Sequence, residues 1–151
     1  GPLSAYRAIL EAKERGAKLV VIDPCRAGMG EMADMWVPII PGSDGALAMA
    51  MTKLILERHL YDEGFVKNYT RGFEAYEAYL KTLSVDRLSK CCGIPVRMIE
   101  ELTRLFLSTE KISLVSYTGL EYQLSGVQNN RAIQILWAIT GKVDVEGRHL
   151  Y

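Results

Sequence analysis

Cysteine is scarce in this chain, which holds three in 151 residues. Cys91 and Cys92 are adjacent, a spacing that does not build a disulfide framework. Both are far in sequence from Cys25, His59 and His149, so we expect no zinc or iron–sulfur site, which needs several ligands at short spacing. Cys91 and Cys92 are instead expected to pack as small hydrophobic side chains. Neither histidine has a partner at short spacing, and we assign neither of them a catalytic role.

The sequence also lacks an excess of either charge and any long apolar run. Its 18 basic and 18 acidic side chains cancel, so no strong field is available to attract nucleic acid or an anionic membrane. No apolar run approaches the roughly 20 residues that span a bilayer, and no basic-then-apolar leader is present. At 49% hydrophobic residues the chain suits one domain with an ordinary core. We therefore expect a soluble domain without direct contact to nucleic acid or membrane.

A glycine-rich phosphate loop directly after a first strand is absent as well. A stand-alone nucleotide-binding module of Rossmann type needs such a loop at the start of a helix. Gly28 and Gly30 follow a different strand and do not open a helix. A generic nucleotide-binding α/β module is therefore the less favoured interpretation.

The spacing of apolar residues predicts helices and strands in alternation. The helix that starts at Asp44 carries apolar residues on more than one stripe, so we expect other parts of the protein to cover it. The last helix begins with Ser125 and Gln128 at the spacing of a capping box. The expected elements in chain order are a helix from Ser4 to Gly16, strands at 18–23 and 35–40, a helix from Asp44 to about Leu60, short helices near Asp62, after Gly72, from Ser84 and from Pro95, a strand at 111–118, and a helix from Ser125 to about Thr140.

This order favours an α/β fold, a Rossmann-like three-layer domain in which helices cover both faces of a small parallel sheet. Because the chain opens on a helix that feeds a strand, we expect the first strand of the sheet to be missing through truncation. Gly1, Pro2 and Leu3 resemble the scar that a protease leaves after removing an expression tag. Residues 4–151 are then the partial domain.

Two segments indicate a nucleotide site. A β-branched run at 20–22 ends in Asp23, as in a buried parallel strand that delivers a carboxylate at its carboxyl end. In dinucleotide folds such a carboxylate holds ribose hydroxyls. Further along, residues 41–46 form a Pro-Gly turn that places Ser43 and Asp44 at the start of an apolar helix. The alternatives are that Asp44 only caps this helix and that Asp23 only forms a turn.

With these segments in place, the chain resembles part of the large subunit of molybdopterin oxidoreductases, the dimethyl sulfoxide reductase superfamily. The resemblance covers nearly the whole chain in order. It implies an excised α/β domain that cradles a guanosine diphosphate arm of the bis-molybdopterin guanine dinucleotide cofactor, with molybdenum or tungsten in the parent oxidoreductase. The matching segments are GAKLVVIDP at 16–24, MADMWVPI at 32–39, PGSDGAL at 41–47, LYD at 60–62, TGLEYQ at 118–123, GVQ at 126–128 and ITG at 139–141.

The resemblance also implies residue roles. It places Asp23 near the ribose and Asp44 on the guanine edge, where a carboxylate matches two adjacent N–H donors. Gly42 and Ser43 would offer backbone amides, and the loop from Gly119 would run close to the cofactor. Catalytic and metal-ligating residues are not expected in this piece. The expected cofactor-binding residues are Asp23, Pro24, Arg26, Gly42, Ser43, Asp44, Gly119, Glu121 and Tyr122.

Two departures from the family pattern bear on these roles. Members usually carry Asp-Pro-Arg and then Thr, whereas residues 23–26 read Asp-Pro-Cys-Arg and shift the basic side chain by one position. Tyr122 stands where Gln is common, with Gln123 beside it. Such losses also fit a cofactor-free structural relative, such as the large iron–sulfur subunit of respiratory complex I. The acidic side chains of Asp23 and Asp44 argue against that alternative.

The implied partners are the remaining domains of the parent subunit. The resemblance also allows iron–sulfur and membrane-anchor subunits, with any iron–sulfur cluster held elsewhere in the parent. Because several domains grip the cofactor in this family, we expect the isolated piece to be inactive, to bind guanosine nucleotides weakly and to carry no cofactor. The resemblance does not indicate substrate, electron partner or compartment.

Overall fold

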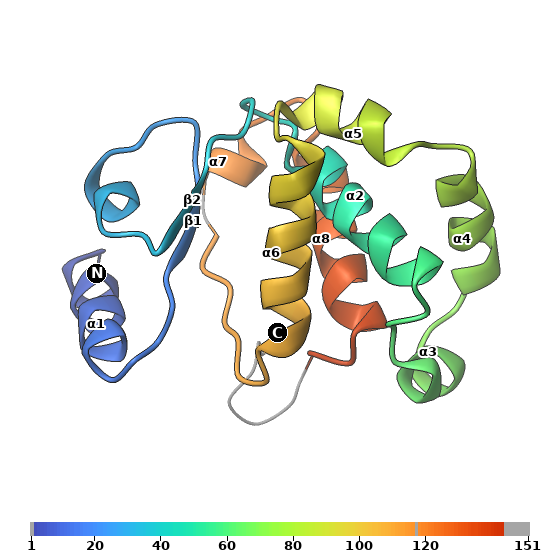
Figure 1. The fold of residues 1–151 in the computed structure, drawn as a ribbon, viewed down its shortest axis with the longest axis horizontal. Helices are drawn as coiled ribbons and strands as arrows, with labels where there is room; N and C mark the ends of the chain where they lie inside the picture. Colours follow the sequence, from blue (N-terminus) through green and yellow to red (C-terminus); the bar gives the residue numbers. More distant parts are fainter. Residues whose placement is uncertain (1, 117, 144–151) are drawn as a thin grey trace. The chain divides into compact units, whose positions relative to one another are not determined.

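A computed structural model gives the structure of residues 2–116 and 118–143, with side chains from Tyr6 onward. The chain divides into two compact units, residues 1–39 and 40–151. Within the described residues, the first unit contains both strands, and the second contains helices without strands (Figure 1). The predicted α/β class with a small parallel sheet is therefore confirmed.

The first unit is built on one parallel pair of strands. Val20 lies opposite Met35, and Ile22 lies opposite Val37. Both strands fall where the β-branched and apolar runs predicted them, but each has only three residues. The elements of this unit are α1 (Pro2–Glu14), β1 (Val20–Ile22), the 3₁₀ helix η1 (Gly28–Glu31) and β2 (Met35–Val37).

Helix α1 ends at Glu14, two residues before the predicted Gly16, and begins earlier than predicted. Gly16 takes φ +93°, and its N–H donates to the carbonyl of Lys13 at 2.8 Å. Glycine is favoured there because a left-handed φ costs it little. The helix begins at Pro2, two residues before the expected cap at Ser4. Proline is well suited to a first helical turn, where its missing N–H has no partner to lose.

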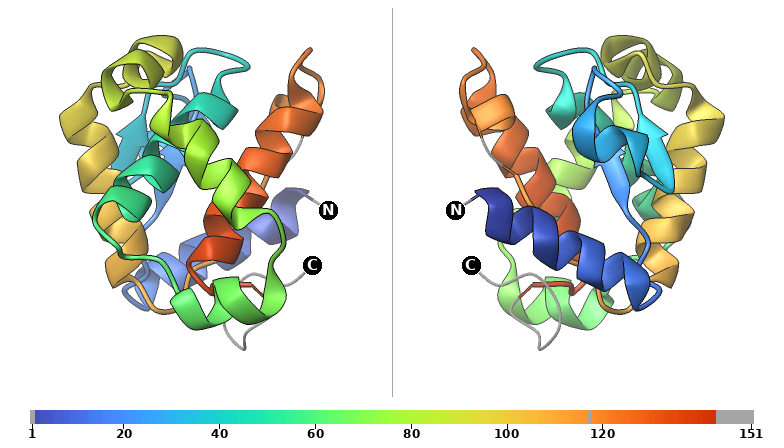
Figure 2. Two further views of the ribbon diagram at one scale, coloured as in Figure 1. Left: turned by 90° about the vertical axis from the view of Figure 1, so that its right-hand side faces the viewer. Right: turned by 90° about the vertical axis from the view of Figure 1, so that its left-hand side faces the viewer.

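The second unit is a set of helices around α2. Helix α2 packs against α8, α5, α6 and α4, and residues on nearly all of its sides are buried, as its apolar composition predicted. The start of α3 lies next to the end of α8 (Figures 1 and 2). The helices are α2 (Asp44–Glu57), α3 (Glu63–Tyr69), α4 (Phe73–Lys81), α5 (Val85–Cys92), α6 (Val96–Ser108), α7 (Thr118–Glu121) and α8 (Gly126–Ile139).

Several of these helices begin where the sequence predicted. The carboxylate of Asp62 accepts from the N–H of Phe65 at 2.7 Å, and the hydroxyl of Ser84 accepts from the N–H of Arg87 at 3.1 Å. Each side chain thereby satisfies an N–H that the first helical turn leaves unpaired. Gly72 precedes α4 with φ +77°.

The predicted strand at 111–118 is wrong. Residues 111–116 are irregular, Val115 is 73% exposed, and Thr118 already belongs to α7. Residue 117 lies outside the described residues. A β-prone composition forms a strand only when a neighbouring strand accepts its backbone hydrogen bonds, and the described part of the second unit contains none.

The predicted capping box at the start of α8 does not form. Helix α8 begins at Gly126 as expected, but Ser125 has φ −98° and ψ 15° and makes no side-chain cap hydrogen bond. A capping residue needs an extended backbone to turn its side chain toward the helix N–H groups. Here the backbone serves instead, because the N–H of Gly126 donates to the carbonyl of Gln123 at 2.9 Å.

Candidate functional site

Ser43 closes the turn before α2. Gly42 takes φ +80°, a conformation that favours glycine. The N–H of Ser43 donates to the carbonyl of Ile40 at 3.2 Å, and its hydroxyl donates to the same oxygen at 2.6 Å. Both donors of Ser43 are therefore used inside the turn. The N–H of Gly42 has no acceptor among residues 2–116 and 118–143.

Asp44 is the first residue of α2, and its carboxylate is available. The side chain is half-buried, and burial raises its pKa, an effect that its own backbone N–H offsets only in part. Among the described residues, no other group donates to this carboxylate. The next N–H groups of the helix are satisfied elsewhere: that of Gly45 by Asn129 at 3.0 Å, and that of Ala46 by the carbonyl of Ser43 at 2.9 Å. Asp44 therefore does not act as a conventional helix cap.

Asn129 is the residue of this region that sequence reasoning missed. It lies on α8, is 4% exposed, and contacts both ends of the turn. Its Nδ2 donates to the carbonyl of Gly42 at 3.1 Å, and its Oδ1 accepts from the N–H of Gly45 at 3.0 Å. The available signal was a polar amide on the same helix face as Ala132 and Leu136, three and seven residues further on.

The segment around α7 lies beside the same turn. A Cβ on Gly42 would lie 3.1 Å from Oε1 of Gln123. Glu121 and Tyr122 are exposed, Tyr122 at 83%, and a Cβ added to Gly119 would meet nothing within 4 Å. The structure thus brings the two predicted segments of the second unit together, with Gln123 as the residue in contact.

Asp23 follows β1 and makes a local turn. Its Oδ1 accepts from the N–H of Cys25 at 2.8 Å, and its carbonyl accepts from Nε1 of Trp36 at 2.9 Å. Asp23 and Pro24 are both exposed. The turn formation that we set against ligand binding therefore does occur, but it uses only one carboxylate oxygen. Among the described residues, no group donates to Oδ2 of Asp23.

Arg26 lies against an aromatic ring in the first unit. Its guanidinium carbon is 5.8 Å from the centre of the Trp36 ring. Gly30 lies beside this pair, and a Cβ there would be in ordinary van der Waals contact with both, 3.8 Å from Arg26 Cγ and from Trp36 Cδ1. The residue remains exposed, so its cationic head stays accessible. Asp23, Pro24 and Arg26 form one group in the first unit, and the other predicted site residues form a second group in the second unit.

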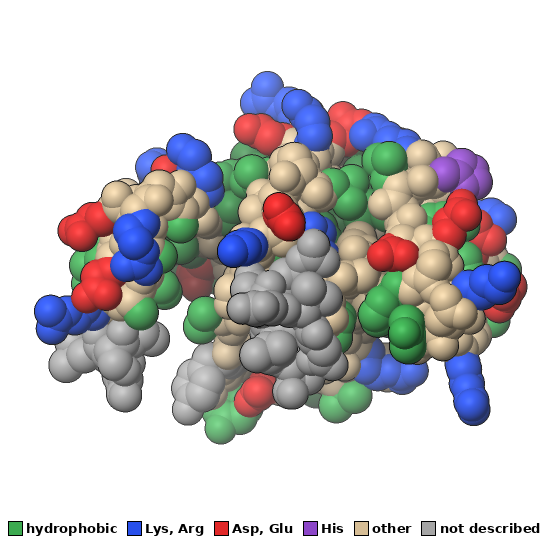
Figure 3. All heavy atoms as spheres, turned by 90° about the horizontal axis from the view of Figure 1, so that it is seen from below, with side chains coloured by type: hydrophobic (Ala, Val, Ile, Leu, Met, Phe, Trp, Pro, Cys, Tyr) green, Lys and Arg blue, Asp and Glu red, His purple; other side chains and the backbone are tan. Residues whose placement is uncertain are grey.

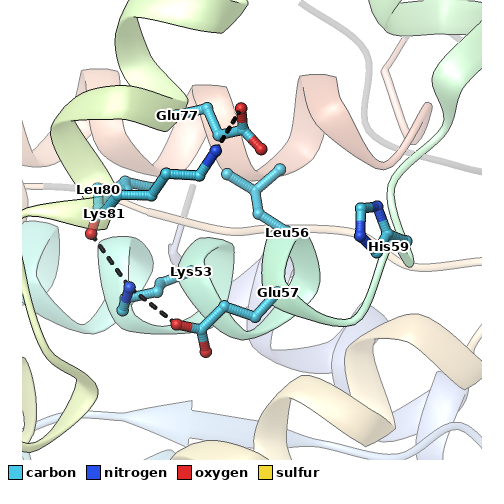
Figure 4. A pocket seen from close by; sticks show the side chains of 7 residues that line it. All are labelled: Lys53, Leu56, Glu57, His59, Glu77, Leu80 and Lys81. Atoms are coloured by element: carbon cyan, nitrogen blue, oxygen red, sulfur yellow. Dashed lines mark hydrogen bonds and ion pairs between the residues drawn. The ribbon is translucent and has the colours of Figure 1, made fainter.

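A shallow hollow of about 150 Å³ lies apart from Asp44, over α2 and α4 (Figure 4). Nζ of Lys53 lies between the carbonyl of Leu80 at 3.2 Å and Oε1 of Glu57 at 2.8 Å. Lys81 pairs with Glu77 at 3.0 Å. These cations are already matched by acceptors, and none of the predicted site residues lines the hollow.

The described residues contain no metal centre. Among residues 2–116 and 118–143, no three His, Cys, Asp or Glu side chains gather in a way that could hold an ion. Cys92 is buried, and burial raises the pKa of its thiol, whereas Cys91 is exposed. Only Cys92 therefore packs as a small hydrophobic residue as we expected. His59 lies two residues after the last residue of α2 and takes φ 51°, and His149 lies outside the described residues.

The surface carries both charges. On the face shown in Figure 3, Lys and Arg side chains are interspersed with Asp and Glu, in line with the balanced composition. Of the helices that the structure describes, none has the length and apolar character needed to cross a bilayer.

The chain is similar to known proteins along nearly its whole length. The family model described as molybdopterin oxidoreductase matches residues 2–150. The chain is 36% identical over 146 residues to the F420-dependent formate dehydrogenase subunit alpha of Methanocaldococcus jannaschii, covering 97% of this chain and 22% of that protein. It is 32% identical over 139 residues to the acetylene hydratase of Syntrophotalea acetylenica, covering 92% and 19%.

A solved structure agrees with these relatives. Acetylene hydratase from Pelobacter acetylenicus matches the fold with a TM-score of 0.86 at 32% identity, over 92% of this chain and 19% of that one. The chain thus spans about a fifth of the length of the proteins it matches. The resemblance inferred from the motifs is confirmed, and the chain belongs to the molybdopterin oxidoreductase family.

Proposed function

We propose that this chain forms the guanosine-binding part of the molybdopterin guanine dinucleotide site in a larger molybdenum- or tungsten-dependent oxidoreductase. The observation that carries the proposal is the carboxylate of Asp44. It is half-buried at the start of α2, and the described residues give it no donor except its own N–H. Half-burial removes part of the water that would solvate this carboxylate, and a ligand that supplies donors offsets that cost.

The guanine edge supplies the matching donors. Its ring N–H and exocyclic amino group are adjacent, and one carboxylate accepts from both. Burial disfavours the ionised form of Asp44, whereas two N–H donors stabilise it. Binding of guanine should therefore lower the pKa of Asp44. This coupling favours guanine over bases that lack the exocyclic amino group.

The other predicted site residues of the second unit are proposed to line the same guanosine arm of the cofactor. The N–H of Gly42 is a donor without an acceptor in the described residues, so it is suited to a ligand oxygen. Ser43 shapes the turn and has both of its donors engaged there. Gly119, Glu121 and Tyr122 lie on the segment beside Gly42, where exposed side chains can reach a ligand.

The first group is proposed to contact the ribose and a phosphate. Oδ2 of Asp23 has no donor among the described residues and can accept from a ribose hydroxyl. Pro24 fixes the backbone after it. Arg26 packs over Trp36 and keeps an exposed guanidinium, whose donors suit a phosphate.

The bound cofactor supplies the metal centre for two-electron or oxygen-atom transfer, and the residues of this chain orient one arm of it. Formate dehydrogenase and acetylene hydratase are both among the relatives, so neither substrate is carried over to this protein. We propose the remaining domains of the parent subunit as partners, and iron–sulfur or membrane-anchor subunits as further ones. The isolated chain should be inactive.

Metal and pterin analysis of the complete subunit, purified anaerobically, tests the proposal. We expect molybdenum or tungsten together with guanylated pterin, and less of both in Asp44→Ala. Asp62→Ala is the matched control, because Asp62 also stands at a helix start but its carboxylate accepts from Phe65. A folded subunit without metal and pterin would identify a cofactor-free structural relative instead.

A further inference from the structure

We propose that Asn129 is a positioning residue that sets the location of the Asp44 carboxylate and thereby the preference of the site for guanine. This inference rests on the function proposed above. In the proposed site, Asn129 does not contact the guanosine ligand. It acts through the turn that carries Asp44.

The first support is the geometry of the two hydrogen bonds from Asn129 to Gly42 and Gly45, which together we call the clamp. Asn129 reaches the turn from α8, and its side chain bonds to Gly42 and Gly45, the residues on either side of Ser43 and Asp44. Its two partners lie 87 and 84 residues away in sequence, so the contact is tertiary and does not form within the turn. Asn129 therefore fixes the position of Asp44 relative to α8, the helix that packs most extensively on α2.

The second support is the chemistry of the side chain. Gly42 presents a carbonyl acceptor, and Gly45 presents an N–H donor. A carboxamide offers a donor and an acceptor on one small planar group, whereas an ionised carboxylate offers acceptors alone. An ionised Asp at position 129 would keep the bond to Gly45 but would face the carbonyl of Gly42 without a donor. Leu would lose both bonds.

The third support is the close approach of Gly45 to Asn129, which leaves no room for a side chain at Gly45. A Cβ on Gly45 would lie 2.7 Å from Oδ1 of Asn129 and 3.3 Å from its Cα. The turn and α8 thus approach as closely as a glycine allows. A methyl group at Gly45 should displace the turn from Asn129 without altering Asn129 itself, which provides an independent test of the same clamp.

The test measures base discrimination in the complete subunit freed of cofactor. GDP and IDP are titrated by calorimetry, because IDP lacks the exocyclic amino group. We expect the natural protein to bind GDP about tenfold or more tightly than IDP, since one charged hydrogen bond is lost with IDP. The ratio should fall by about threefold or more in Asn129→Asp, Asn129→Leu and Gly45→Ala. A ratio does not change with the fraction of folded protein.

Asn130 provides the matched control. It follows Asn129 on α8, but its Nδ2 donates to the carbonyl of Gly126 within the same helix, at 3.0 Å. Asn130→Asp and Asn130→Leu should keep the full GDP preference.

The outcomes separate this inference from the proposed function. If the natural protein does not distinguish GDP from IDP, the proposed function fails first. If it does, and Asn129→Asp keeps the full ratio, the positioning role of Asn129 is refuted while guanosine binding stands. Failure of the nearly isosteric Asn129→Asp to fold would also refute it, because Asn129 would then be needed for the fold and not specifically for the site.

Discussion

The carboxylate of Asp34 accepts a hydrogen bond from the backbone N–H of Leu19, with 2.7 Å between Oδ2 and the nitrogen. Leu19 directly precedes β1 and Asp34 directly precedes β2, so this bond joins the two strands at the end where Val20 faces Met35. Nζ of Lys13 donates to the same oxygen at 2.7 Å. One exposed side chain therefore links α1 to both strands of the small sheet.

Removal of this carboxylate should loosen the start of the sheet in a pH-dependent way. The hydrogen bond from Leu19 and the ion pair with Lys13 hold the pKa of Asp34 below its usual range. The contribution of Asp34 to the stability of the folded protein is therefore complete above its unfolded-state pKa. It is lost as the pH falls through its folded-state pKa. In Asp34→Ala the amide of Leu19 should exchange faster with solvent, by a factor that shrinks in acid. Equal exchange rates in both proteins at neutral pH would contradict this role.

Gly126 should not tolerate a side chain. A Cβ there would collide with the carbonyl oxygen of Glu121, so Gly126→Ala should force α7 away from the start of α8. We expect a loss of about 1–3 kcal/mol in the free energy of unfolding, measured by urea denaturation. Gly119→Ala is the control, because nothing lies within 4 Å of the added methyl, and its effect should be neutral or slightly stabilising. Equal effects of the two substitutions would show that the collision relaxes at no cost.

Tyr76 carries a buried hydroxyl that its surroundings do not satisfy. Neither its OH nor Oγ1 of the nearby Thr52 has a hydrogen-bond partner of good geometry among the described residues. Burial raises the pKa of Tyr76 to about 12, and the Thr52 hydroxyl offsets the rise only in part. Tyr76→Phe should therefore leave the free energy of unfolding unchanged or raise it by about 1 kcal/mol.

The pH dependence of Tyr76 has a definite sign. The unfolded chain releases the phenolic proton near pH 10, before the folded protein does, so stability should fall between pH 10 and about 12. Tyr76→Phe should remove part of this fall, because phenylalanine has no phenolic proton to release. Denaturation midpoints measured across this pH range test the prediction. Identical dependence of the midpoint on pH for Tyr76→Phe and the natural protein would contradict a contribution from Tyr76.

Local sequence signals predicted most of the fold. Asp62 and Ser84 cap helices because their short polar side chains reach N–H groups one turn ahead, which requires only neighbouring residues. The strand expected at 111–118 could not be judged from local signals in this way, because a strand depends on a partner strand that sequence periodicity does not reveal. The capping box at Ser125 does not form because Ser125 lacks the extended backbone that a cap needs, and the residue pattern does not reveal that conformation.

The site was only partly predictable. The Pro-Gly turn and its acidic residue stand next to each other in sequence, so Asp44 could be singled out from the pattern and from the family resemblance. Asn129 could not, because its role depends on two bonds that span more than 80 residues. A buried amide on an otherwise apolar helix face is the signal to look for in such cases.

The most direct test of the central claim is a change of base specificity at Asp44. Asn at this position offers one donor and one acceptor, which match the carbonyl and ring N–H of xanthine and no longer the paired donors of guanine. In the complete subunit freed of cofactor, we expect the natural protein to prefer GDP over XDP by about tenfold or more, and Asp44→Asn to reverse that order. Asp62→Asn should keep the natural preference. An Asp44→Asn protein that is folded and still prefers GDP would contradict the assignment of Asp44 to the guanine edge.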